Sequence, residues 1–259
     1  MQMDQDRIRA IIKAEHSYWG GPDIPIRKDT RWGPGIWDLI AQELSPTSRV
    51  LDVGCGASSL LLDLSTSFHT GIGVDIDNEA LQIAEEAKRE QGIKNVDFLL
   101  LDFPREIDRL QPESFDLVIS LRGPIGDTDL QVQAAHHLLR PDGLIFCEEI
   151  AELHEKEVDK IFFTDDYHSR KIKPRVNEVK TMMERNGFEV RLAADNFTKW
   201  IYPDIYAWLQ YQCNLWTWLG GSLPEPDDPR IALFAERNTN VKGEIEITHH
   251  VCWVAGVKQ

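Results

Sequence analysis

The fold is indicated by one short stretch, Val50-Leu51-Asp52-Val53-Gly54-Cys55-Gly56-Ala57-Ser58-Ser59. An apolar strand ends there in an acid and two glycines, and a helix follows. Glycine at positions 54 and 56 removes the Cβ that would hold a ligand away from the backbone. The N–H groups of the turn and of the helix N-terminus are then free to meet a ligand. The stretch predicts a doubly wound α/β fold that presents a nucleotide-like cofactor at its first turn.

Three interpretations of this turn compete. A dinucleotide-binding loop has three glycines in the pattern G-x-G-x-x-G, and Ser59 stands at the third position. A plain strand–helix turn is the second, since many turns contain a single G-x-G. The acid Asp52, two places before Gly54, favours a third, another class of nucleotide-like cofactor site.

Two further predicted strands also end in acids. Thr70-Gly71-Ile72-Gly73-Val74-Asp75 ends in an acid nineteen residues after Gly56, which leaves room for one crossover helix from Ser58 to about Ser67. An acid at this strand end can accept hydrogen bonds from both ribose hydroxyls of a nucleoside. Asp77 then predicts the N-cap of a helix that ends at Gly92. The strand Val96–Phe103 brings Asp102 to the same edge.

The segment Asp52-Val53-Gly54-Cys55-Gly56 resembles motif I of the class I S-adenosylmethionine-dependent methyltransferases, (D/E)-x-G-x-G-x-G, with Ser58 in place of the last glycine. The segment Ser114-Phe115-Asp116-Leu117-Val118-Ile119-Ser120 resembles motif IV of that family. Leu138-Leu139-Arg140-Pro141-Asp142-Gly143-Leu144-Ile145-Phe146 resembles the helix, turn and strand that follow. The matches stand in the family's order and spacing.

The resemblance covers residues 36–150 and, more loosely, 174–195. It implies a seven-stranded, mostly parallel Rossmann-like sheet, S-adenosyl-L-methionine as cofactor, and methyl transfer as activity. It also implies that Asp75 binds the ribose and that Asp102 lies near the adenine amino group. The residues it assigns to cofactor binding are Asp52, Gly54, Cys55, Gly56, Asp75, Ile76, Asp102, Phe103 and Ser120.

We expect a single methyltransferase domain over residues 1–259. Its parts are an N-terminal helix and loop cap (1–35), the core (36–197), an insertion (198–243) and the last strand (244–259). Within these parts the apolar spacing predicts helices over 6–19, 36–44 and from Pro174 to Gly187, and strands over 188–192 and 244–257. The minimal family fold joins its last two strands tightly, so the insertion is an addition.

The composition disfavours some classes of function. A net charge of −15 disfavours nucleic acid as a partner, because phosphate charge must be offset by Lys and Arg. The one dense basic run is Arg170-Lys171-Ile172-Lys173-Pro174-Arg175, which reads as a solvated loop. No apolar run reaches the ~18 residues that span a bilayer, and we expect no membrane contact. Four separated cysteines and no apolar leader predict reduced thiols in a cytoplasmic protein.

The insertion is rich in aromatic residues. Seven of the thirteen Trp and Tyr residues lie between positions 200 and 218. Large apolar faces with a polar tip suit the wall of a ligand pocket, although the same residues can attach an extra helix or form a dimer contact. We expect Tyr202 and Tyr206 on one helical face, and we expect that helix to close with residues 16–32 over the carboxyl ends of the first and fourth strands. The substrate-contact candidates are Tyr18, Trp19, Trp32, Arg122, Tyr202 and Tyr206.

The cofactor supplies the reactivity in methyl transfer, so the protein needs mainly to align the substrate and exclude water. His16 is the candidate general base, because its ordinary pKa is near neutral. Arg122 follows the fourth strand and can bind an anionic substrate group, or pair with an acid of the chain. Metal-dependent catechol-type methyltransferases place an acid just past this strand, so the resemblance implies that Leu121-Arg122-Gly123-Pro124 favours a metal-independent reaction.

Three classes of function remain open. The first is methyl transfer to the O, N or C atom of a small molecule, and the second is methylation of RNA or protein, which an exposed basic patch would indicate. The third is a non-catalytic scaffold that binds the cofactor. The sequence identifies neither the substrate nor the oligomeric state.

Overall fold

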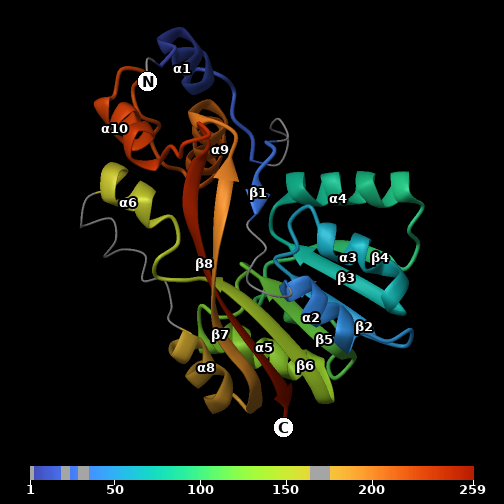
Figure 1. Cartoon of the computed structure of the whole chain (residues 1–259). Coiled ribbons are helices and arrows are strands. Elements are labelled where there is room, and N and C mark those ends of the chain that lie inside the picture. Colours follow the sequence, from blue (N-terminus) through green and yellow to red (C-terminus); the bar gives the residue numbers. More distant parts are fainter. Residues whose placement is uncertain (1–2, 19–23, 29–34, 164–175) are drawn as a thin grey trace. The chain divides into compact units, whose positions relative to one another are not determined.

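The computed structural model describes residues 3–18, 24–28, 35–163 and 176–259 (Figure 1). The chain forms two compact units, each assembled from three separate segments. We call the first the sheet unit, made of Gly33–Glu152, Lys173–Asn196 and Val251–Gln259. The second is the aromatic unit, made of Met1–Trp32, Leu153–Ile172 and Phe197–His250.

The sheet unit has the predicted doubly wound architecture. Its strands stand in the order β7-β8-β6-β5-β2-β3-β4, all parallel from β6 to β4, with β8 antiparallel to β6. The seven-stranded, mostly parallel sheet is therefore confirmed. Its elements are α2 (Ile36–Glu43), β2 (Arg49–Val53), α3 (Ser59–Asp63), β3 (Thr70–Asp75), α4 (Asn78–Gln91), β4 (Val96–Leu100), β5 (Phe115–Leu121), α5 (Asp129–Leu138), β6 (Leu139–Ile150) and α8 (Val176–Arg185). The strands β7 (Phe188–Tyr202) and β8 (Ile245–Lys258) each belong partly to this unit and partly to the aromatic unit.

Alternation along the strands divides the core between the two faces of the sheet. Leu51 and Val53 of β2 pack in the cluster that also contains Val132 of α5 and Met183 of α8. Val50 packs in a second cluster, together with residues of α2 and α3. Successive side chains of a strand point to opposite faces, so one strand supplies both clusters. Figure 1 shows α2, α3 and α4 alongside β2, β3 and β4.

Local signals place the helix that follows β3. The Asp77 carboxylate accepts hydrogen bonds from the N–H groups of Glu79 (3.0 Å) and Ala80 (3.3 Å), as an N-cap does. Gly92 ends α4 in the left-handed region at φ 68°. Two predicted elements on either side of α4 are shorter than expected. The crossover helix α3 ends at Asp63, before a short 3-10 turn, and the strand β4 ends at Leu100, before Asp102.

The strand predicted over 188–192 is much longer than expected. It extends as β7 to Tyr202, beside the fourteen-residue β8. Asp195 and Asn196, which have low strand propensity, lie within β7 because pairing with a long neighbour outweighs propensity. Tyr202 therefore ends a strand, and the expectation that it shares a helical face with Tyr206 is wrong.

The aromatic unit surrounds its own apolar cluster, which contains Ile8, Phe162, Trp208 and Phe234. Among its described residues the helices are α1 (Gln5–Ile12), α6 (Lys156–Phe162), α9 (Ile205–Trp218) and α10 (Pro229–Asn238), and the short β1 (Arg27–Lys28) pairs with the end of β7. The predicted helix 6–19 therefore ends at Ile12. None of the helices in the described ranges is long and apolar enough to cross a membrane.

The N-terminal helix binds the insertion within this unit. The backbone N–H of Asp4 donates to the Tyr206 hydroxyl at 2.7 Å, and the Arg7 guanidinium lies 4.0 Å from the centroid of the Tyr206 ring. Arg7 also pairs with Asp204 at 3.7 Å. The N-terminal part and the insertion thus belong together, with residues 153–172 as a third contributor that the sequence did not indicate. Their closure over the sheet stays a prediction.

Candidate functional site

The glycine-rich turn follows β2 and packs on the loop that follows β5. The N–H groups of Gly54 and Cys55 both donate to the carbonyl oxygen of Val74, at 2.8 and 3.1 Å. Gly54 adopts φ 76°, and a Cβ added to it would lie 2.8 Å from the Cα of Gly123. The site at the first turn therefore depends on glycine for both backbone conformation and space.

Ser58 occupies the place of the third glycine of the motif and keeps its geometry. Its φ of 55° and ψ of 43° lie in the left-handed region, immediately before α3. A non-glycine residue pays roughly 1–2 kcal/mol there. Its hydroxyl is buried without a hydrogen-bond partner among the described residues. Ser58 thus keeps the geometry of the turn, while its left-handed backbone and its unbonded hydroxyl cost folding free energy.

Asp75 links the ends of β2 and β3. One carboxylate oxygen accepts the N–H of Gly56 at 2.8 Å and the other accepts the N–H of Asp77 at 2.9 Å. A carboxylate has about four lone-pair sites, so each oxygen can accept one more hydrogen bond. Asp75 can therefore hold the turn and still accept hydrogen bonds from two hydroxyls of a ribose.

Asp52 is the buried acid of the turn, with 4% of its surface exposed. Burial, followed by the negative charge of Asp75, raises the pKa of Asp52 to about 7. The carboxyl group therefore titrates near neutral pH. Cys55, next to it, is half-buried, and burial raises the pKa of its thiol, which stays protonated.

We expect cofactor affinity to depend on this titration. S-adenosylmethionine carries positive charge, so it binds better when Asp52 is ionised and affinity should rise about three- to ten-fold from pH 6 to pH 8. Stability of the free protein should move the other way: the folded state holds a proton that the unfolded state has lost, so unfolding free energy falls between about pH 4 and 7.

Calorimetric titration with S-adenosylmethionine at several pH values measures the effect. In Asp52→Asn, which does not titrate, the affinity should be nearly constant over the same range. A wild-type affinity that does not change between pH 6 and 8 would contradict the role of Asp52.

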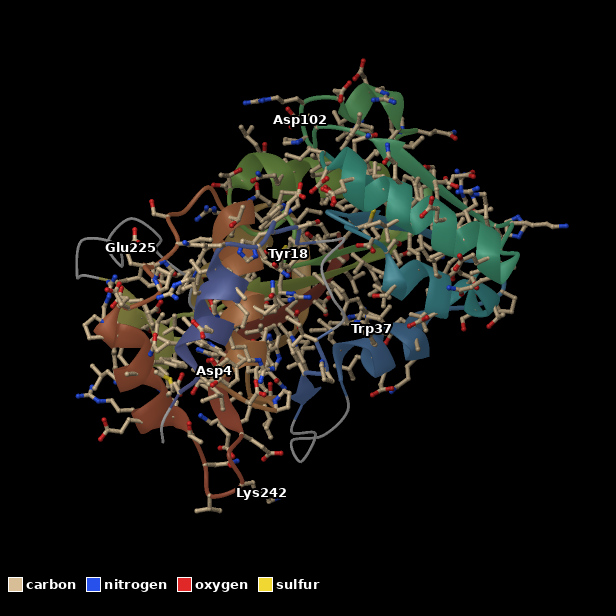
Figure 2. All side chains as sticks on the ribbon, turned by 90° about the horizontal axis from the view of Figure 1, so that it is seen from above. Asp4, Tyr18, Trp37, Asp102, Glu225 and Lys242 are labelled. Atoms are coloured by element: carbon tan, nitrogen blue, oxygen red, sulfur yellow. The ribbon has the colours of Figure 1, made fainter. Side chains whose placement is uncertain are left out.

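The remaining cofactor candidates lie on the loops after β3 and β4. Ile76 follows Asp75 and is 71% exposed, so it offers an apolar surface that an adenine ring can cover. Figure 2 shows Asp102 on the loop after β4 with its side chain at the surface, where Arg105 pairs with it at 2.9 Å. Phe103 is buried in the core, so its side chain has a packing role.

The loop after β5 is held from inside the sheet unit. Ser120 is fully buried, and its hydroxyl accepts the N–H of Ile125 at 3.3 Å, so it supports the loop. The Arg122 Nε lies 3.5 Å from an oxygen of Glu148, whose other oxygen accepts the Trp253 indole N–H at 2.7 Å. Arg122 therefore pairs through Nε with an acid of the chain, and its contact with an anionic substrate group stays a prediction.

Glu149 is a buried acid that sequence reasoning missed. Burial raises its pKa to about 9, so it is protonated at neutral pH. The Cys147 Sγ lies 2.8 Å from the carbonyl oxygen of Ile125 and 3.3 Å from a Glu149 oxygen. A thiol has one proton, so a proton on Glu149 lets both contacts be hydrogen bonds. The signal in the sequence that would have revealed it is the pair of acids Glu148 and Glu149 at the end of the strand β6.

Glu149→Gln is expected to stabilise the protein at alkaline pH. Because the folded pKa lies above the unfolded value, wild-type stability falls as pH rises from about 4.5 to 9, by at most about 1.4 kcal/mol per pH unit. The amide has no such dependence. Urea unfolding at pH 5, 7 and 8.5 should show a gain that grows with pH. The exposed Glu90→Gln is the control, and parallel pH curves for Glu149→Gln and wild type would contradict a neutral Glu149.

The substrate candidates lie mostly in the aromatic unit. Tyr18 stacks on Trp218 with centroids 5.1 Å apart, and Tyr202 is fully buried. His16 has Nδ1 3.0 Å from the Asn214 Oδ1 and Nε2 3.4 Å from the carbonyl oxygen of Ile12, so a base role would require one of these contacts to break. The candidates Trp19 and Trp32, and the basic run 170–175, lie outside the described residues.

Comparison with known proteins agrees with the fold described above. The family model described as a methyltransferase domain matches residues 44–191. A ubiquinone biosynthesis O-methyltransferase of Actinobacillus pleuropneumoniae is 29% identical over 155 residues, which are 57% of this chain and 65% of that protein. The chain thus spans about two thirds of the length of that relative, and the match leaves out the rest of both proteins.

Solved structures with the same fold are more distant in sequence. A protein of unknown function from Deinococcus radiodurans aligns over 98% of both chains with a TM-score of 0.59 and 18% identity. The cyclase SpnF aligns over 98% of this chain and 92% of its own with a TM-score of 0.56 and 16% identity. Because a cyclase shares the fold, the fold alone does not determine the reaction.

Proposed function

The chain belongs to the methyltransferase domain family, and from that membership we propose that it transfers a methyl group from S-adenosylmethionine to a small molecule. The observation that carries the proposal is the turn after β2. There the backbone N–H groups of Gly56 and Asp77 donate hydrogen bonds to the Asp75 carboxylate. Its remaining lone pairs can accept hydrogen bonds from a ligand. The cofactor supplies the electrophilic methyl group when bound, and this chain's residues bind and orient it.

A hydroxyl oxygen is the acceptor atom that we favour over nitrogen or carbon. The support is the O-methyltransferase name of the relative from A. pleuropneumoniae, together with the aromatic side chains of the aromatic unit. No metal ion is part of the proposal, because Arg122 stands after β5, where a metal-dependent site would carry an acid. The expected cytoplasmic location stays a prediction.

Two alternatives make different predictions. Methylation of RNA or protein needs an exposed basic patch beside the cofactor, and the net charge of −15 disfavours it. A scaffold without activity would bind the cofactor and transfer nothing.

A two-step experiment tests the proposal. Calorimetry first measures binding of S-adenosylmethionine, with a nicotinamide dinucleotide as the competing ligand class. Purified protein is then incubated with methyl-labelled cofactor and a panel of small phenols, alcohols and amines, with total RNA and histone as macromolecular controls. Label found in small molecules supports the proposal, label in RNA or protein supports the first alternative, and cofactor binding without any transfer supports the scaffold.

A further inference from the structure

The aromatic unit contains buried polar atoms that its described residues do not satisfy. They include the hydroxyl of Tyr202, the indole Nε1 of Trp200 and the Oε1 of Gln212. Tyr202 and Gln212 are 0% exposed and Trp200 is 6% exposed. A buried polar atom without a hydrogen bond opposes folding, so several of them in one unit require an explanation.

The three residues belong to one group. The rings of Trp200 and Tyr202 both contact the ring of Tyr211, at centroid distances of 5.8 and 5.6 Å. Gln212 follows Tyr211 on α9, and its Nε2 donates to Glu155 at 3.0 Å. Burial raises the pKa of Tyr202, and the negative charge of Glu155 adds to that rise.

Flat side chains border this group. The Trp200 ring stacks on His249 with centroids 4.4 Å apart, and Tyr18 meets Tyr211 edge to face at 6.5 Å. These residues come from the N-terminal segment, β7, α9 and β8, so the fold brings them together from four places in the chain. Aromatic faces with a few fixed polar atoms are the usual lining of a small-molecule site.

We propose that Trp200, Tyr202 and Gln212 bind the acceptor substrate, and that this substrate is an uncharged planar molecule with a hydroxyl group, of the phenol class. The inference rests on the proposed function and names its substrate class. A phenolic hydroxyl can accept from the Trp200 or Tyr202 donor and donate to the Gln212 oxygen. Its ring can pack on the aromatic side chains. Glu155 would repel a carboxylate or phosphate at this place.

An internal water molecule is the competing occupant, because it can satisfy the same atoms. The two explanations differ in what the Tyr202 hydroxyl does in the free protein. If it awaits a ligand, its removal leaves the free protein as stable as before or more stable and weakens ligand binding. If it holds a structural water, its removal destabilises the protein and leaves ligand binding unchanged.

The probe is catechol, followed by quenching of tryptophan fluorescence and by calorimetry on the full chain. Tyr202→Phe should bind catechol about three- to ten-fold more weakly, the scale of one hydrogen bond, with an unchanged or higher Tm. Tyr206→Phe is the matched control, because its hydroxyl already has Asp4 as partner. It should bind catechol normally and have a lower Tm. Cyclohexane-1,2-diol, which has the hydroxyls without the plane, should not bind.

Two results would overturn the inference. One is a wild-type protein that does not bind catechol, and the other is a Tyr202→Phe variant with a lower Tm and unchanged catechol affinity. Titration with S-adenosylmethionine separates this outcome from the proposed function. Cofactor binding without catechol binding removes only the substrate inference, whereas catechol binding without cofactor binding keeps the site and removes the proposed methyl transfer.

Discussion

Gly123→Ala is expected to destabilise the protein by an amount at or above the upper end of the about 1–3 kcal/mol that overpacking costs. The added Cβ would lie 2.3 Å from the carbonyl oxygen of Val53 and 2.6 Å from the Ser120 hydroxyl. Val53 immediately precedes Gly54, so relief of the clash moves the cofactor turn. Moving a binding group by about an ångström can cost on the order of 100-fold, and cofactor affinity should fall on that scale.

Urea unfolding and calorimetric titration with S-adenosylmethionine measure the two effects. Gly35→Ala, before α2 in the same unit, is the matched control. Its Cβ would meet no atom closer than 3.7 Å, so the substitution should cost at most about 1 kcal/mol, the scale of an N-cap change. Equal losses in the two variants would show that the contact between the two loops is unimportant.

Asp75→Ala is expected to lose about 1.5–3 kcal/mol of cofactor affinity, the scale of hydrogen bonds to a charged acceptor. The structure adds a second reason, because the substitution also leaves the N–H groups of Gly56 and Asp77 without their acceptor. Asp75→Asn keeps the size of the side chain and removes its charge, so it should fall between Asp75→Ala and wild type.

The control for Asp75 is Asp97→Ala, which removes an exposed acid of β4 that pairs with Lys88 at 3.4 Å. Its cofactor affinity should equal that of the wild type. An Asp75→Ala variant with full affinity, or tighter binding of a nicotinamide dinucleotide by the wild type, would be incompatible with the assignment of this acid to the ribose.

The parts of the fold that the sequence predicted are those with local causes. Gly54 marks a turn where a positive φ favours glycine, and the cap residues Asp77 and Gly92 fix α4 through bonds to their immediate neighbours. Each of these signals is contained within a few residues. The end of β3 at Asp75, and with it the central acid of the candidate site, was therefore predictable.

The remaining features depend on residues far apart in the chain. The length of β7 comes from its long neighbour β8, so Tyr202 was assigned to the wrong element. The pairing of Arg122 with Glu148 and the proton on Glu149 result from strand register and burial. The third segment of the aromatic unit, 153–172, is polar in sequence and gave no sign of its place.

The bond between Asp4 and Tyr206 has a consequence for synthesis of the protein. The two residues lie 202 positions apart, and a ribosome that adds about 5–20 residues per second needs roughly 10–40 seconds to make the chain between them. During that time α1 has been synthesised and α9 is not yet complete. Until then Ile8, which is fully buried in the folded protein, lacks the apolar contacts that α9 provides. Helix α1 is thus protected from proteases by α9 only after the chain has been made as far as α9.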